Sequence, residues 1–239
     1  MVFDFSALVE QRHAIASGVA TTMSLSLSSV VISLVAGLLV ALGQRSGIRL
    51  LDYLLGAYIQ LFRNTPLLIQ IYFFYKALPF AGIYLDPFLC GMLALSLQTT
   101  AYMAEIYRSG FEAVPKAQVE SGLALGMTRV QTNLTIILPQ AIGIIMPPLG
   151  NQIIGVIKNS SLVAFITVAD LFFVVYEQSV THFRYLEFFT VGILLYMAMT
   201  IGTSWVLFGL ENWLLRRLTG QPSRAWLARP ATICASEVV

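Results

Sequence analysis

Long uncharged apolar stretches alternate along this chain with short groups of charged residues. Four stretches are near or above the about 20 residues that a helix needs to cross the hydrocarbon core of a bilayer. They cover residues 14–44, 87–104, 130–157 and 188–210. The pattern therefore predicts four membrane-spanning helices.

A fifth apolar region, residues 51–79, is interrupted by the polar sequence Arg63-Asn64-Thr65-Pro66. Proline lacks a backbone donor and disfavours helix at the residue before it. We therefore expect a span made of two helical pieces, with the freed backbone groups satisfied by protein or water. The pair Pro147-Pro148 predicts a second break, inside the stretch 130–157.

Composition supports a membrane protein. Hydrophobic residues make up 57% of the chain and charged residues 11%, against about 45–50% and about 25% in soluble domains. The first apolar stretch is longer than the core of a signal peptide and lacks a basic segment before it, so we expect it to remain as a span. The predicted fold class is all-α and integral to the membrane, with about five transmembrane helices.

The distribution of basic residues predicts the orientation. Lysine and arginine concentrate on the cytoplasmic side of membrane proteins. With the N-terminus outside and the C-terminus in the cytoplasm, nine of the 14 basic residues lie inside. These nine are Arg45, Arg49, Arg108, Lys116, Arg129, Arg216, Arg217, Arg224 and Arg229.

Two regions do not fit a spanning helix. Between residues 159 and 187 the apolar runs 162–167 and 171–176 are too short to cross, which predicts a re-entrant or interfacial helix pair on the outer side. Residues 219–239 have a mixed composition with two prolines and are predicted to form a flexible cytoplasmic tail. Residues 1–218 are then one transmembrane domain.

The central loop, about residues 111–139, carries small side chains at helical spacing. They recur at intervals of four, four and three, at Ala113, Ala117, Ser121 and Ala124. Such a stripe lets another surface approach the backbone closely. By itself it is also compatible with an amphipathic helix that lies on the bilayer surface.

The end of this loop helix is predicted by Gly126, which is placed for a left-handed stop. Thr128 with Gln131 three residues later matches a capping box and predicts the start of a second short helix. Together these signals predict a helix, a turn and a helix.

The same loop resembles the EAA loop of the membrane-spanning subunits of bacterial ABC importers. The resemblance lies in Glu120-Ser121-Gly122, in Gly126 six residues after the glutamate, and in Ile136-x-Leu138-Pro139. Ser121 and Gly122 depart from the two alanines that are usual in the family. Residues 62–67, 100–108, 113–118 and 158–162 further resemble the polar amino acid branch of the family.

This resemblance implies a type I importer permease fold in the bacterial inner membrane. It implies a pairing with an identical or homologous permease, two cytoplasmic ATPase subunits that bind ATP and magnesium, and a periplasmic solute-binding protein. It also implies an ATPase contact through the loop residues Ala117, Glu120, Ser121, Gly122, Ala124 and Gly126.

The chain has no Gly-x-x-x-x-Gly-Lys-Ser/Thr phosphate-binding sequence. We therefore predict a non-enzymatic subunit, without cofactor or metal of its own and without a nucleic-acid partner. Its energy must come from another polypeptide or from an ion gradient. The alternative to an ABC permease is thus a gradient-driven carrier or channel for small polar solutes.

Polar residues at membrane depth are costly and are candidates for solute contact. Asp170 and Glu177 are seven residues apart, so on a helix they share a face and would form a carboxylate pair for an ammonium group. The alternative is that both lie in the outer aqueous layer.

Three further candidates follow the stretch 130–157. Asn159 precedes Ser160 and Ser161, either of which would cap the next helix and present backbone amides to a carboxylate. Simple capping without a ligand is the alternative. Gln98 is a candidate because a long amide inside a span is not easily satisfied by its own backbone.

Two other groups have structural interpretations. Glu105 and Arg108 are three residues apart and predict an ion pair that anchors the loop. The serines of the first span, Ser24, Ser26, Ser28 and Ser29, would line a polar path or join helices, and we favour the second.

Overall fold

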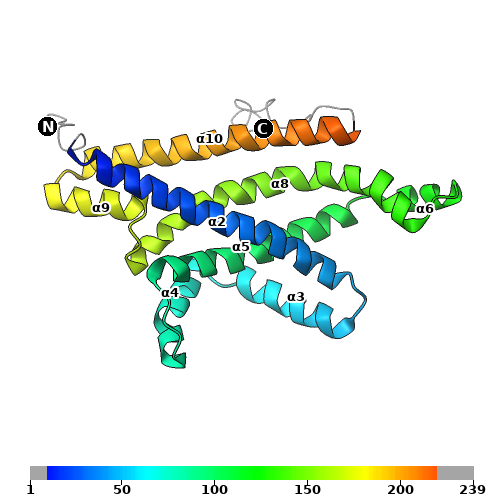
Figure 1. Ribbon diagram of the computed structural model, residues 1–239, viewed down its shortest axis with the longest axis horizontal. Coiled ribbons are helices and arrows are strands. Elements are labelled where there is room, and N and C mark those ends of the chain that lie inside the picture. The colour runs from blue at the N-terminus through cyan, green and yellow to red at the C-terminus, as the bar shows by residue number, and fades with distance from the viewer. Residues whose placement is uncertain (1–9, 220–239) are drawn as a thin grey trace, which may run out of the picture. The chain divides into compact units, whose positions relative to one another are not determined.

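The computed structural model describes residues 10–219, and within that range it consists of helices without a strand (Figure 1). The all-α prediction is confirmed. The longer helices are α2 (Arg12–Gln44), α3 (Arg49–Arg63), α4 (Leu67–Ala77), α5 (Pro87–Glu112), α6 (Lys116–Ala124), α8 (Leu138–Asn159), α9 (Leu171–His182) and α10 (Tyr185–Thr219). The shorter ones are η1 (Leu78–Ala81), α7 (Arg129–Thr132), η2 (Asn133–Ile137) and η3 (Ser160–Ile166).

The described residues form two compact units. The first unit contains the chain up to residue 108 and residues 151–201. The second contains residues 109–150 and the chain from residue 202 onward. The predicted tail, residues 219–239, lies outside the described residues apart from Thr219, the last residue of α10.

In the first unit α2 packs against α3 and α9, with Gly43 close to Leu55 of α3 and Gly18 close to Leu171 of α9. Ser26 and Ser29 are buried, whereas Ser24 and Ser28 donate to carbonyls of the preceding turn of α2. Ser33 is also buried and donates to the Ser96 carbonyl of α5 at 3.0 Å. Small buried residues let helices approach closely, so the inner serines serve helix packing.

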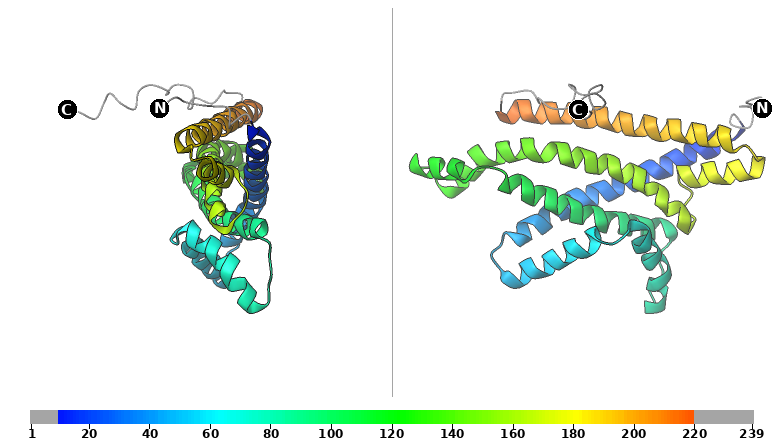
Figure 2. Two further views of the ribbon diagram at one scale, coloured as in Figure 1. Left: turned by 90° about the vertical axis from the view of Figure 1, so that its left-hand side faces the viewer. Right: turned by 180° about the vertical axis from the view of Figure 1, so that it is seen from behind.

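The predicted break in the fifth apolar region is confirmed. α3 ends at Arg63 and α4 begins at Leu67, and the residue before α4, Pro66, has an extended backbone. Figure 2 shows α4 leaving the direction of α3 at this point. The fixed φ of proline and its missing donor account for the position of the break.

Side chains satisfy the carbonyl groups that the break leaves free. Gln70 is buried and its amide donates to the carbonyls of Phe62 and Thr65 at 3.0 and 3.1 Å. Gln98 of α5 donates to the same two carbonyls at 3.5 and 3.3 Å. Because unpaired backbone groups are costly inside a membrane protein, these amides make the interruption tolerable.

The second predicted break is wrong. α8 continues from Leu138 to Asn159 with Pro147 and Pro148 inside it. Two consecutive prolines remove two backbone donors, but their fixed φ of about −65° is compatible with a helix. Here the intact hydrogen bonds on either side of the pair maintain a continuous helix.

Three helical stretches are long and apolar enough to cross a membrane, judged by length and composition over the described residues. They are Arg12–Gln44, Arg129–Ile166 and Tyr185–Arg217. α5 has 26 residues but a more polar second half, and α3 and α4 are individually short. The count of five spans and the orientation stay predictions.

The region 159–187 contains two short helices, η3 and α9, as its two short apolar runs predicted. Thr167 follows η3 and Phe183 follows α9, and both have the left-handed backbone that ends these helices. The location of the pair relative to the bilayer stays a prediction.

Candidate functional site

The loop between α5 and α8, in the second unit, turns at Gly126. This glycine has a φ of 81°, a conformation that residues with a Cβ rarely adopt. The Gly126 amide donates to the Leu123 carbonyl at 3.0 Å, and the Met127 amide donates to the Gly122 carbonyl at 3.1 Å. These two bonds form a Schellman motif that satisfies the last carbonyls of α6. The predicted glycine stop is confirmed.

The second half of the loop begins with the predicted capping box. The Thr128 hydroxyl accepts from the Gln131 amide at 3.2 Å, and the Gln131 side-chain oxygen accepts from the Thr128 amide at 2.9 Å. The chain then continues through α7 and the π-helix η2 into α8. The helix, turn and helix are confirmed, and the groups that shape the turn all lie within the loop.

Three of the four small residues of the predicted stripe lie on the outer face of α6, whereas Ala113 precedes this helix and is separated from it by Pro115. Ala117, Ser121 and Ala124 are exposed, and so is Glu120. Leu125, at the turn, is 81% exposed. The result is an outward face of small side chains bordered by a large apolar one.

Gly122 differs from the other predicted loop residues because it is buried inside the loop. A Cβ at this position would lie 2.6 Å from the Thr132 Cγ2 and 3.2 Å from the Ile136 Cδ1. The methyl group of an alanine therefore does not fit unless Thr132 shifts. Gly122 brings α6 against the following helical segment, and this contact accounts for the glycine where the family usually has alanine.

The predicted ion pair at the end of α5 is present. The Arg108 Nε donates to Glu105 Oε2 at 3.0 Å. Glu105 also lies 3.9 Å from the guanidinium of Arg63, the last residue of α3. The same guanidinium lies over the Tyr102 ring, 5.3 Å from its centroid. The carboxylate thus connects α5 to the broken helix, a link that the sequence spacing did not reveal.

Asp170 is fully buried at the start of α9. Its Oδ1 accepts from the Phe173 amide at 2.9 Å, and its Oδ2 accepts from the Tyr196 hydroxyl at 3.1 Å. Burial raises the pKa of this carboxyl to about 6, because its effect is larger than the opposing effect of the hydrogen bonds. Both oxygens are engaged in capping α9 and joining it to α10.

Glu177 lies in α9 and is exposed. Asp170 is the capping residue before that helix and is buried, so the structure does not bring the two carboxylates together around one cavity. The predicted pair for an ammonium group therefore has no geometric support.

The serines after α8 do not cap the next helix, and this prediction is wrong. Ser160 and Ser161 donate back to the carbonyls of Ile157 and Lys158, each at 2.8 Å. Asn159 has helical backbone angles, so η3 continues from α8 without a break. Since no new helix begins here, no cap position is available.

A pocket nevertheless lies beside Ser161, in the first unit. It has a volume of about 430 Å³ and is lined by Lys158, Ser161, Phe172, Tyr196, Met197 and Thr200. Lys158 is exposed and provides the positive charge of the lining. Of the six predicted solute-contact residues, only Ser161 lines this pocket.

Sequence reasoning missed several residues that organise these sites. Gln70 carries the same signal as Gln98, a long amide within an apolar stretch, and that signal was available four residues after Pro66. Tyr196 and Thr200 lie in an apolar helix without a distinguishing pattern. Only the fold brings Tyr196 to Asp170.

The chain combines helices that are long and apolar enough to cross a membrane with a self-capped loop that exposes a face of small side chains. These features are those of a membrane transport subunit. In agreement, residues 14–219 match the family described as binding-protein-dependent transport system inner membrane component. The chain belongs to this family, whose members are non-catalytic permease subunits of ABC transporters.

Individual relatives agree with the family match. The probable glutamine ABC transporter permease protein GlnM of Bacillus subtilis (strain 168) is 39% identical over 77% of this chain and 85% of that protein. The glutamine transport system permease protein GlnP of Escherichia coli (strain K12) is 34% identical over 89% of this chain and 98% of that protein. Such bacterial permeases are inner membrane proteins, and this chain is one of them.

Solved structures show the same fold. A crystal structure of an amino acid ABC transporter with histidines is 35% identical, with a TM-score of 0.82 over 91% of this chain and 100% of that chain. The inward-facing MetNI methionine ABC transporter, at 16% identity and a TM-score of 0.66, supports the fold alone. The chain has a type I importer permease fold, and an ABC permease is favoured over the gradient-driven carrier.

Proposed function

We propose that this permease forms the translocation path of an ATP-driven amino acid importer and works by alternating access. The names of its relatives, which include glutamine and arginine permeases, support amino acids as the solute class. In this proposal the working complex contains a second identical or homologous permease, two cytoplasmic ATPase subunits that bind ATP and magnesium, and a solute-binding protein.

The observation that carries the proposal is the exposed small face of α6. Ala117, Ser121 and Ala124 leave the helix backbone accessible to a partner surface. The Schellman turn at Gly126, the capping box at Thr128 and the packing of Gly122 against Thr132 hold this face in place from within the loop. A face that is accessible and locally rigid transmits a push or pull from a docked ATPase to the adjoining helices.

The proposed cycle uses the exposed small face of α6 as the contact with the ATPase. Closure of the ATPase subunits on ATP draws the two loops together and opens the path outward, where the binding protein delivers its solute. Hydrolysis separates the loops and opens the path inward. The chain itself supplies docking, movement and the solute path, and its partners supply the nucleotide chemistry.

A matched pair of tryptophan variants tests the docking face. Ala117 and Gln118 are both exposed, but they point about 100° apart on a helix of 3.6 residues per turn. We expect Ala117→Trp to block close approach of the ATPase and Gln118→Trp to leave it intact. The measurements are ATP hydrolysis by the reconstituted complex and retention of the ATPase during purification.

The control separates docking from folding, because both variants add the same side chain to an exposed position of one helix. Uptake that continues in the Ala117→Trp complex, or that proceeds without ATP, would contradict the proposal.

We further propose that the pocket beside η3 contacts the solute through Lys158 and Ser161. The Lys158 ammonium group at the edge of a pocket of about 430 Å³ suits the carboxylate of an amino acid, and pockets of this size are typical of small-molecule sites. The Ser161 hydroxyl donates its proton to the Lys158 carbonyl, so toward the solute it acts as an acceptor for the ammonium group of the amino acid. Neighbouring Asn159 is exposed and remains a candidate contact. Glu177 is also exposed but does not line this pocket.

The charge of Lys158 is the feature to test. We expect Lys158→Gln to raise the solute concentration needed for half-maximal uptake, since the carboxylate loses its counter-charge, and Lys158→Arg to retain most of the affinity. The measurement is the concentration dependence of uptake into proteoliposomes with ATP inside. Equal affinities for the two variants would reject this pocket while leaving the docking proposal untouched.

A further inference from the structure

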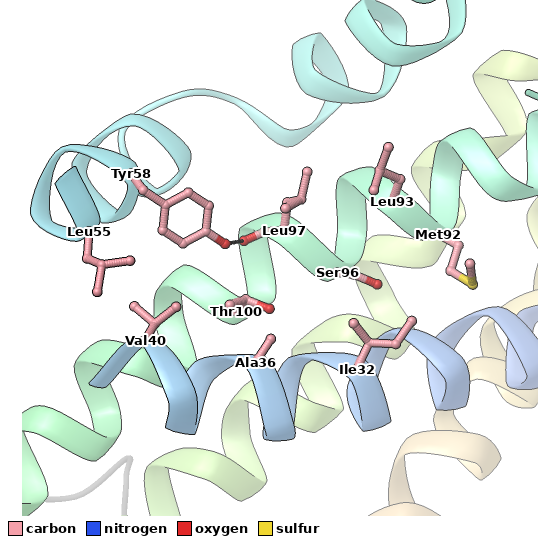
Figure 3. A pocket seen from close by; sticks show the side chains of 10 residues that line it. All are labelled: Ile32, Ala36, Val40, Leu55, Tyr58, Met92, Leu93, Ser96, Leu97 and Thr100. Carbon is pink, nitrogen blue, oxygen red and sulfur yellow. Dashed lines mark hydrogen bonds between the residues drawn. The ribbon is translucent and has the colours of Figure 1, made fainter. Parts of the chain in front are cut away.

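A second pocket in the first unit lies between α2, α3 and α5 and has a volume of about 380 Å³. Figure 3 shows Ile32, Ala36 and Val40 pointing into it from α2, Leu55 and Tyr58 from α3, and a face of α5 completing the lining. This pocket shares no residue with the one beside η3. Its chemistry is therefore separate from that of the proposed solute path.

The lining is almost entirely apolar. The Tyr58 hydroxyl is already bound, because it donates to the Leu97 carbonyl of α5 at 2.7 Å. The Ser96 hydroxyl is buried and has no hydrogen-bond partner among the described residues. A polar solute would lose its hydration here and find only the Ser96 and Thr100 hydroxyls as further partners, so the pocket fits a hydrocarbon group better.

The pocket opens onto an apolar surface. Ile32 belongs to the lining and is itself 43% exposed, and on the same helix Val35 and Leu39 are 61% and 63% exposed. In a membrane-spanning helix, exposed apolar side chains of this kind suit contact with lipid hydrocarbon. The opening is thus placed where a lipid chain could enter from the bilayer.

The volume distinguishes between the two kinds of occupant that a bilayer offers. A helix with its side chains is about 10–12 Å across, so one 5.4 Å turn occupies roughly 400–600 Å³. A pocket of about 380 Å³ therefore takes a flexible chain or single side chains more readily than the backbone of a helix from another subunit. A flexible hydrocarbon chain enters a space of this size without requiring the surrounding helices to separate.

Basic residues at the adjoining turn indicate the rest of the ligand. Arg45 follows Val40 of the lining by five residues, or about 8 Å of helix, and Arg49 precedes Leu55 by six, or about 9 Å. Asp52 reduces the charge of this turn, which stays positive. Arginine pairs well with phosphate, so the turn suits the headgroup of a phospholipid whose chain extends toward the pocket.

We propose that the pocket between α2, α3 and α5 binds one acyl chain of a phospholipid whose phosphate lies at the α2–α3 turn. The bound lipid fills the gap between three helices of the first unit and stabilises their packing. This inference depends on the chain being a membrane protein and is independent of which solute it carries.

Photolabelling tests the proposal on the whole transport complex in vesicles of phosphatidylethanolamine and phosphatidylglycerol. A trace of phosphatidylglycerol carries a diazirine in its acyl chain, and labelled peptides are identified by mass spectrometry. We expect adducts to concentrate on the pocket face of α5, from Met92 to Thr100, and to exceed those on the outward positions Val35 and Leu39.

Two variants on α2 sharpen the test. Ala36→Phe fills the pocket and is expected to lower the α5 adducts roughly tenfold, the change that 1.4 kcal/mol of lost binding produces. Val35→Phe adds the same ring on the lipid-facing side and is expected to leave them unchanged. Arg49→Gln is expected to lower labelling by the anionic probe more than labelling by a zwitterionic one.

The distribution of adducts in the unaltered complex decides the outcome even if Ala36→Phe folds poorly. Equal labelling of the pocket and of outward positions would overturn the proposal, because it would indicate ordinary contact with bulk lipid. Weaker labelling of the pocket would overturn it as well, since a protein surface would then cover the opening.

Discussion

Two interruptions of helix in this permease, the loop turn at Gly126 and the break at Pro66, are stabilised in opposite ways. The loop turn is satisfied by groups within a few positions, through the Schellman bonds and the Thr128 capping box. The break is satisfied partly from a distance, because Gln98 of α5 donates to the carbonyl of Phe62, 36 residues away. A self-contained turn leaves its outer face available to a partner, whereas the break is tied into its own unit.

The largest effect on coupled ATP hydrolysis is expected at the self-contained turn. Gly126→Val places a β-branched residue at a φ of 81°, where even an ordinary L-residue costs about 1–2 kcal/mol. We expect the docking face to be displaced and coupled ATP hydrolysis to fall by about tenfold or more, as 1.4 kcal/mol corresponds to a factor of ten.

Gly126→Asn is the control, since asparagine tolerates the left-handed region better than other residues with a side chain. It should retain most of the coupled hydrolysis of the reconstituted complex. If both variants couple normally, local turn geometry does not determine docking.

The next effect concerns the packing inside the loop. Gly122→Ala forces a methyl group against Thr132, and overpacking of this kind typically costs about 1–3 kcal/mol. Adding Thr132→Ala removes the opposing side chain and should restore much of the loss. A double-mutant cycle on the thermal stability of the complex and on its coupled hydrolysis measures the interaction.

Additive effects of the two substitutions would show that the Gly122–Thr132 contact does not limit the loop. Thr132→Ala alone also removes the hydroxyl that donates to the Thr128 carbonyl at 3.0 Å, so the single variant is an essential corner of the cycle.

A smaller effect on coupled hydrolysis is expected at the break, which lies outside the docking loop. Gln70→Leu leaves the carbonyls of Phe62 and Thr65 with weaker partners, and an unsatisfied buried group costs about 1–3 kcal/mol. Gln98→Leu should cost less, because its two bonds, at 3.5 and 3.3 Å, are longer than those of Gln70. Thermal unfolding of the two purified variants gives the order, and the reverse order would show that the distant cap is the principal one.

The smallest effect is expected at the capping box. Thr128→Ala removes a cap, worth about 0.5–2 kcal/mol, but the substitution lies at an exposed position and leaves the helix joined to α8. We expect a modest loss of stability and nearly normal coupling, and Thr128→Ser should match the parent. A loss of coupling as large as that of Gly126→Val would mean that the whole loop depends on this cap.

The same contrast explains what the sequence predicted well. The loop helix, the Gly126 stop and the Thr128–Gln131 box are set by residues next to each other in the chain, so their pattern was sufficient. The break at Pro66 was predictable for the same reason. Pro147 and Pro148 carried a similar signal, but there the surrounding helix continued through both.

The solute candidates were harder because a polar residue in an apolar stretch has several possible partners. Asp170 and Gln98 were correctly noticed as unusual, yet both bind protein groups that only the fold brings near them. Gly122 was grouped with the outward residues by its place in the motif, and its burial depends on Thr132, ten residues later.

The π-helical turn at 133–137 has a consequence for how this chain tolerates length changes. A turn of this kind holds one residue more than an α-helical turn, so it absorbs a single-residue insertion without disturbing its flanks. Deleting one residue there would yield a regular helix with α7 and α8 still in phase. Deleting one residue elsewhere in α8 would rotate everything beyond it by about 100°. Length variation among homologous loops is therefore expected to concentrate in this short segment.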